Sequence, residues 1–260
     1  MRIRIAAAIA ALSVGLTACQ GQQSPPSMPK TLNTTTEQPT TVQPTTENPQ
    51  TSDAIPPSNA LSTSQTRVNG KQGTVNYDVT LPQVLGGNGS AATAFNDGMR
   101  ALLQKRIDTY STAVSITDSS KLSKVEHIGT HVVSGFLWLS IDGGGAHPWT
   151  ELATYVINID TKKEITLADL FNDQQAGLDA LSVQAAKLLP ATKTGDSYDR
   201  KGITATVEHF QTWTATPSGM HVYFQMGQVG PAAMGPVDIT IPWDDLINVL
   251  KPGRVALMSS

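Results

Sequence analysis

Residues 136–159 read FLWLSIDGGGAHPWTELATYVINI and give the strongest indication of the fold. Its two ends, 136–141 and 150–159, are rich in branched and aromatic side chains, which is typical of β-strands. Between them lie three consecutive glycines and Pro148, residue types that favour turns. We therefore expect a hairpin connection between two antiparallel strands.

The connection also has a functional interpretation. Three glycines let the backbone approach another surface, and their successive N–H groups can form a concavity that binds an anion. His147 would add a titratable contact and Trp149 a stacking face. We favour the plain hairpin, but keep a candidate ligand-binding loop made of Asp142, Gly143, Gly144, Gly145, His147 and Trp149.

Further strands and helices are predicted on both sides of this hairpin. Apolar residues recur at helical spacing from Ser90 to Ile107 and from Leu178 to Leu189, and Pro242 begins a short helix. The remaining predicted strands are 67–81, 125–134, 165–167, 220–226 and 237–241. Strand clusters separated by two packing helices indicate an α+β fold with a mostly antiparallel sheet.

The first eighteen residues have the features of a bacterial lipoprotein signal peptide. Arg2 and Arg4 precede an apolar run, 5–16, that is too short to span ~30 Å of hydrocarbon as a helix. The run ends in Leu-Thr-Ala-Cys at 16–19, which resembles a lipobox. We expect cleavage between Ala18 and Cys19 and lipidation of Cys19, whose two or three acyl chains would hold the protein on the extracytoplasmic side of the bacterial cell membrane. An ordinary signal peptide is the alternative.

The next segment has the composition of a tether. Residues 19–65 are rich in Thr, Pro, Gln and Ser and contain no aromatic residue. Such a segment cannot bury enough apolar surface to offset its ordering entropy, so we expect a disordered stalk, either a plain spacer or a glycosylated one. The folded domain is then expected over 66–260.

Composition and motifs exclude several function classes. A single Cys excludes an internal disulfide and every CxxC-type zinc or redox site, and a net charge of −3 argues against nucleic acid. The chain has no G-x-S-x-G elbow and no glycine-rich nucleotide-binding motif. His127 and His131 would lie about 13 Å apart on a strand, too far to share one metal ion. We therefore expect no metal and no cofactor.

Three stretches carry a resemblance to a known family. They are GGAHP at 144–148, YVINID at 155–160 with ITLADLF at 165–171, and GMHVYF at 219–224 through VGPAAMG at 229–235 to ITIPW at 239–243. Together they resemble a domain of unknown function shared by the extracellular part of the lysozyme-sensing anti-sigma factor RsiV, some envelope polysaccharide deacetylases and a secreted mycobacterial immunogenic antigen. The resemblance implies a curved sheet and no agreed catalytic residues. The predicted fold is thus a mostly antiparallel curved sheet packed by two main helices.

These observations leave three hypotheses for function. The first is a lipid-anchored, non-catalytic binding domain for a lysozyme-like protein or a wall glycan. The second is a cell-envelope hydrolase or esterase with a non-standard site, for which Ser134, Asp142 and His147 are the only candidates. The third is a structural or antigenic lipoprotein without a small ligand.

Overall fold

The computed structural model describes residues 60–87, 89–119 and 123–260. All of them belong to one compact unit, Asp53–Ser260. The expected signal peptide, Cys19 and nearly all of the expected tether lie outside the described residues.

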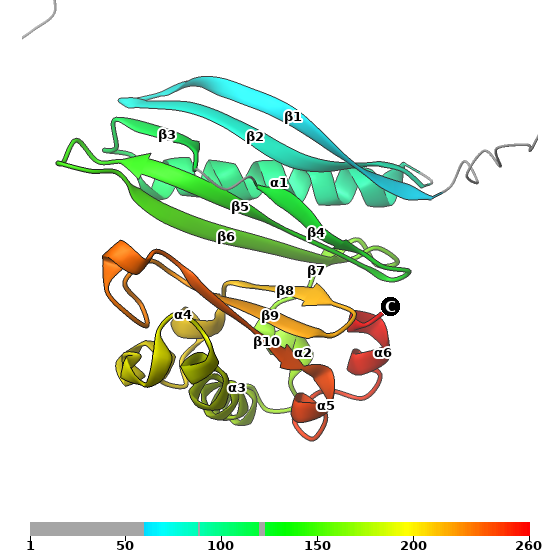
Figure 1. The fold of residues 1–260 in the computed structure, drawn as a ribbon. Coiled ribbons are helices and arrows are strands. Elements are labelled where there is room, and N and C mark those ends of the chain that lie inside the picture. Colours follow the sequence, from blue (N-terminus) through cyan, green and yellow to red (C-terminus); the bar gives the residue numbers. More distant parts are fainter. Residues whose placement is uncertain (1–59, 88, 120–122) are drawn as a thin grey trace, which may run out of the picture. The chain divides into compact units, whose positions relative to one another are not determined.

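The described chain groups its strands and helices in separate runs, as an α+β fold does (Figure 1). Its strands are β1 (Leu61–Gln72), β2 (Val75–Gly86), β3 (Ser115–Asp118), β4 (Lys124–Ile128), β5 (Val132–Asp142), β6 (Trp149–Asn158), β7 (Lys163–Glu164), β8 (Trp213–Thr216), β9 (Gly219–Phe224) and β10 (Val237–Pro242). Its α-helices are α1 (Ser90–Thr109), α2 (Leu167–Leu170), α3 (Gln174–Leu188), α4 (Val207–Phe210), α5 (Trp243–Leu246) and α6 (Arg254–Met258).

The larger sheet is built around the predicted hairpin. Its order is β1-β2-β3-β5-β6-β7, with β4 also paired to β5, and every pair is antiparallel except β2 with β3. β5 and β6 pair without interruption from Val132↔Asn158 to Ile141↔Trp149. The expected hairpin is therefore confirmed, and 142–149 is its connection.

β5 is buried along nearly its whole length because both of its faces are covered. Alternate side chains, among them Val133 and Leu137, lie in the core formed with α1. The intervening side chains, including Phe136 and Trp138, point the other way and meet Tyr223 of β9. A strand buried on both faces needs apolar residues at successive positions.

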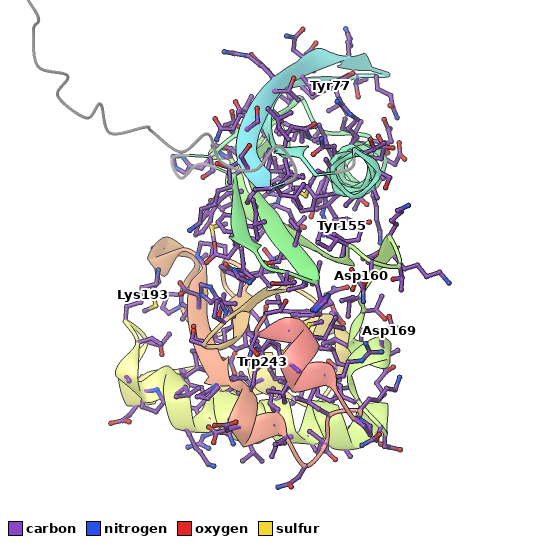
Figure 2. All side chains as sticks on the ribbon, turned by 90° about the vertical axis from the view of Figure 1, so that its right-hand side faces the viewer. Tyr77, Tyr155, Asp160, Asp169, Lys193 and Trp243 are labelled. Carbon is purple, nitrogen blue, oxygen red and sulfur yellow. The ribbon has the colours of Figure 1, made fainter. Side chains whose placement is uncertain are left out.

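α1 fills the concave side of the larger sheet. Figure 2 views this helix nearly end-on, with the strands curving around it. Its buried positions Phe95, Met99, Leu103 and Ile107 recur every three to four residues and pack against β2, β5 and β6. The curved sheet and this first main helix agree with the prediction.

The smaller sheet lies between the larger sheet and α3 (Figure 1). It has the order β10-β9-β8, and β8 contacts β5 and β6. Its other face packs on α3 through residues such as Leu178 and Leu181. The strands predicted over 220–226 and 237–241 belong to this second sheet, where the sequence indicated only one.

Three sequence expectations need correction. The single strand expected over 67–81 is two strands, because Gly73 takes a φ of 60° and forms a two-residue turn between them. The strand expected over 125–134 is likewise divided, and the Gly129 N–H closes the turn onto the carbonyl of Val132. At 165–167 the strand gives way to α2, because the Asp169 carboxylate accepts a hydrogen bond from the N–H of Thr166 and begins a helix.

The domain boundary also differs from the expected one. Residue 66 lies in the middle of β1, which pairs with β2 along all twelve of its residues. The folded part therefore includes residues that composition alone assigned to the tether.

Candidate functional site

A cluster of charged and aromatic side chains lies between the two sheets. It surrounds a cavity of about 210 Å³, which we call the His221 hollow. Its lining residues are Lys124 and Glu126 of β4, Phe136 and Trp138 of β5, His221 and Tyr223 of β9, and Asp238 of β10.

The His221 imidazole lies between two carboxylates from different sheets. Its Nε2 is 2.9 Å from Asp238 Oδ2, and its Nδ1 is 3.4 Å from Glu126 Oε1. The Tyr223 hydroxyl lies 3.1 Å from the same Nδ1. Both ring nitrogens are thus engaged, and the imidazole links the small sheet to β4.

Glu126 lies where the pairing of β4 with β5 is irregular. The register of β4 on β5 shifts between Val125 and His127, so Glu126 lies at a β-bulge. Bulges re-aim side chains next to functional sites. Here Glu126 contacts His221 from β4, and its Oε2 lies 2.9 Å from Lys124 Nζ.

The surroundings hold His221 as a cation. Burial by itself would lower its pKa, but hydrogen bonds and charge from Asp238 and Glu126 outweigh burial and raise the pKa to about 9. The hydrogen bond from His221 lowers the pKa of Glu126 despite the burial of that carboxyl. Burial raises the pKa of Tyr223, which therefore stays neutral. At neutral pH the cluster contains a cationic imidazole and an ionised Glu126.

Aromatic rings form the apolar part of the hollow. The centroid of the Phe136 ring lies 5.4 Å from that of Tyr223 and 6.0 Å from that of Trp138. The Lys124 ammonium lies 5.7 Å from the same Phe136 centroid. The arrangement thus combines two carboxylates, two cations and an aromatic floor, which are groups suited to recognising a polar ligand.

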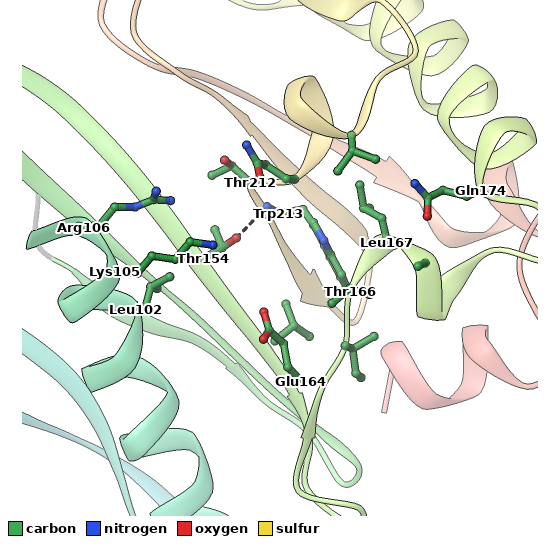
Figure 3. Close-up of a pocket in the computed structure, with 15 residues that line it drawn as sticks. Leu102, Lys105, Arg106, Thr154, Glu164, Thr166, Leu167, Gln174, Thr212 and Trp213 are labelled. Atoms are coloured by element: carbon green, nitrogen blue, oxygen red, sulfur yellow. Dashed lines mark hydrogen bonds between the residues drawn. The ribbon is translucent and has the colours of Figure 1, made fainter. Parts of the chain in front are cut away.

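A second cavity, the Arg106 cleft, opens between α1 and the helices that follow β7 (Figure 3). Its volume is about 320 Å³. Its wall includes Lys105 and Arg106 from α1, Thr154 from β6, and Trp213 at the start of β8. The backbone N–H of Trp213 donates to Thr154 Oγ1 at 3.0 Å, which joins the two sheets at the base of the cleft.

The candidate ligand-binding loop is the exposed connection of the β5–β6 hairpin. Gly144 has a φ of 79°, and its N–H donates to Asp142 Oδ1 at 2.8 Å, so the turn is closed by its own residues. Trp149 packs edge-on against Tyr110 with 5.6 Å between ring centroids. His147 is exposed. No residue of this loop lines the His221 hollow or the Arg106 cleft.

The three hydrolase candidates do not come together. Ser134 is fully buried, and its hydroxyl donates to the carbonyl oxygen of Ala215 at 2.7 Å. Asp142 is eight residues further along the same strand, or about 26 Å away at ~3.3 Å per residue. This separation corrects the hypothesis that Ser134, Asp142 and His147 form one site.

Two further observations concern the described residues as a whole. They contain no group of three or more His, Cys, Asp or Glu side chains placed to hold a metal ion. None of their helices combines the length and apolar character needed to cross a membrane.

Sequence reasoning missed the His221 hollow because its members are far apart in the chain. Glu126 precedes His221 by 95 residues, and Asp238 follows it by 17. His221 and Tyr223 alternate along one strand, which indicates only a shared face. No local motif indicates that Glu126 faces them, since its placement depends on a bulge and on packing between sheets.

Part of the chain is similar in sequence to a family of unknown function. Residues 168–244 match the family model described as "Protein of unknown function (DUF3298)", a range that includes His221 and Asp238 but not Glu126. No curated protein matches the chain.

Two solved structures share the fold. One is a DUF3298 family member from Bacteroides fragilis, with a TM-score of 0.54, 16% identity, and coverage of 77% of this chain and 98% of that one. The other is a DUF3298 family protein from Pseudomonas aeruginosa, with a TM-score of 0.51, 16% identity, and coverage of 75% and 96%. The chain therefore has the fold of these DUF3298 proteins and, over residues 168–244, sequence similarity to their family of unknown function.

Proposed function

We propose that this protein is a lipid-anchored, extracytoplasmic binding protein whose His221 hollow recognises an envelope or host ligand without catalysis. The lipobox-like residues 16–19 support the anchor. The RsiV resemblance supports a lysozyme-like protein as the ligand, and a wall glycan is the second candidate.

This proposal rests on the protonation of His221 and on the contacts of its two ring nitrogens. A general base needs a neutral imidazole with one nitrogen available to the reacting group. Here carboxylates contact both ring nitrogens and keep the imidazole protonated at neutral pH. Because Ser134 is also engaged and buried, the described residues favour recognition over hydrolysis at this place.

The rim of the hollow gives the ligand its contacts. The side chains of Lys124 and Asp238 are 57% and 52% exposed, whereas Glu126 and His221 lie deeper at 12% and 18%. A ligand would therefore meet one positive and one negative group above an aromatic floor. Since these charges balance, we expect only a weak dependence of affinity on salt.

The test is a calorimetric titration of residues 20–260, which contain every described residue, at two salt concentrations. The titrants are a c-type lysozyme and soluble wall-glycan fragments. Saturable binding of either one is expected, together with an affinity at least tenfold weaker in Asp238→Asn. The matched control is Asp160→Asn, which changes the exposed pair of Asp160 with His131.

Two results would overturn the proposal. One is the absence of heat with both titrants at micromolar protein, which would leave a structural lipoprotein. The other is an equal effect of Asp238→Asn and Asp160→Asn, which would move the binding site away from the hollow.

A further inference from the structure

We infer that the Arg106 cleft is a second binding site, and that it takes a short peptide ending in a free carboxylate. The cleft shares no lining residue with the His221 hollow. The inference therefore goes beyond the proposed function and does not depend on it.

The guanidinium of Arg106 is incompletely paired. Its Nε is buried and donates no hydrogen bond to any described residue. Its nearest acid is Glu151, whose Oε1 lies 3.6 Å from this Nε. The side chains of Arg106 and Glu151 are only 20% and 14% exposed, so both groups are largely removed from water. Because Glu151 lies beyond hydrogen-bond distance of this buried nitrogen, the guanidinium is incompletely satisfied by the described residues.

Glu151 is itself shared with another donor. Burial raises the pKa of the Glu151 carboxyl, while the charge of Arg106 and the nearby Tyr110 hydroxyl act to lower it. Glu151 therefore holds Arg106 in place without satisfying all of its donors. The remainder of the guanidinium is directed toward the cleft, as Figure 3 shows for Arg106 and Lys105 together.

Two cationic side chains lie in the wall of the cleft. Leu102, Lys105 and Arg106 lie within one turn of α1 and share a face of that helix. Among the fifteen lining residues the only acid is Glu164, against the two cations Lys105 and Arg106. Because Glu151 lies behind Arg106 and balances its charge, the preference for a carboxylate comes from the planar guanidinium, which can donate two parallel hydrogen bonds, with Lys105 beside it.

The other residues that line the cleft suit a peptide. Thr166, Gln174 and Gln211 offer hydroxyl and amide groups that match the N–H and C=O groups of a peptide. Val207 is 41% exposed and, with Leu102, provides an apolar surface for small side chains. A volume of about 320 Å³ suits a ligand of dipeptide size.

The test uses acetylated dipeptides and the amide spectrum of residues 20–260. N-acetyl-D-alanyl-D-alanine and N-acetyl-L-alanyl-L-alanine are titrated beside their carboxamides, which lack the negative charge. We expect saturable shifts at α1, α2 and Thr212 with the acid, and at least tenfold weaker binding of the carboxamide. Binding of the D,D-dipeptide alone would assign the site to wall stem peptides, and equal binding of both would assign it to peptide carboxylates of any origin.

Variants then locate the site. Arg106→Lys keeps the charge but loses the planar fork, and should weaken acid binding about tenfold. The control Arg100→Lys makes the same change at an exposed position of the same helix. Asp238→Asn should leave dipeptide binding unchanged, which separates this site from the His221 hollow.

The inference is overturned if the carboxamides bind as tightly as the acids, or if neither acid causes saturable shifts at millimolar concentration. Because the comparison of acid with carboxamide is made on the unaltered chain, it does not depend on whether a variant folds.

Discussion

At the scale of the residue, His221 shows how a buried charge is stabilised. Removing an imidazolium from water is unfavourable, and burial is the largest single influence on this group. Asp238 and Glu126 more than compensate, because their carboxylates lie 2.9 Å and 3.4 Å from the two ring nitrogens. The same contacts join β4 of the larger sheet to β9 and β10 of the smaller one.

This arrangement predicts a pH dependence of stability. A pKa raised from 6.5 to about 9 means that the His221 contribution is complete below pH 6.5 and is lost as the pH rises through 9. The pKa of Glu126 is lowered, so its contribution is present above 4.5 and is lost as the pH falls. Tyr223 stays neutral in this interval because burial raises its pKa. The cluster should therefore stabilise the fold most between about pH 4.5 and 6.5.

Urea unfolding of the wild type and His221→Gln at pH 6, 7.5 and 9.5 measures this contribution. The raised pKa of His221 contributes on the order of 3 kcal/mol to the free energy of unfolding at pH 6. The difference in this free energy between the two proteins should shrink toward zero above pH 9. His131→Gln is the control, since its pair with Asp160 is exposed and worth at most about 1 kcal/mol. Parallel pH profiles for wild type and His221→Gln would contradict the assignment.

At the scale of the element, side-chain amides complete strand edges. β7 pairs only with Ile157 and Asn158 of β6, so the ladder does not reach Leu152. Gln225, just after β9, donates from Nε2 to the Leu152 carbonyl at 2.8 Å and accepts from the Leu152 N–H at 3.0 Å. Asn96 of α1 makes the same pair of bonds to Val84 of β2. These amides satisfy backbone groups that would otherwise be buried without partners.

Gln225→Ala should therefore destabilise the fold. It removes both partners of Leu152, and leaving buried polar groups unpaired costs about 1–3 kcal/mol. The measurements are the free energy of unfolding in urea and hydrogen exchange at the Leu152 amide, which should lose protection. Gln65→Ala, at an exposed position of β1, should change the free energy by less than ~0.5 kcal/mol. Unchanged Leu152 protection in Gln225→Ala would argue against this role.

At the scale of the whole molecule, the proposed anchor and the folded unit have separate tasks. Two or more acyl chains hold a protein stably on a membrane, while one chain does so only marginally. The folded unit begins near the start of β1, more than forty residues after Cys19. The proposed lipid would therefore set where the protein is located, and the two cavities would set what it binds.

Cys19→Ser should release the protein from membranes. In detergent phase separation, we expect the unaltered protein in the detergent phase and the variant in the aqueous phase, with loss of radiolabelled palmitate. Ser24→Ala, a substitution a few residues further on, should keep the lipid and the detergent partition. A Cys19→Ser protein that stays with the membrane would disprove the anchor.

The elements that the sequence predicted correctly have strong, continuous patterns. Helical spacing of apolar residues located α1 and α3, and β-branched composition located β6. The first half of β1 and the whole of β3 were missed, because β1 is polar and exposed on an edge, and β3 has only four residues. Such strands are held by pairing with neighbours, which local composition does not report.

By itself, the sequence determined the α+β class, the hairpin at 136–159 and the apolar faces of the main helices, because burial of periodic apolar side chains depends on neighbours along the chain. Three features follow from tertiary packing instead: the strands form two sheets, a bulge directs Glu126 toward His221, and Arg106 faces a cleft. These features arise from contacts between residues distant in sequence, and their geometry is set by packing and by the pairing of buried charges.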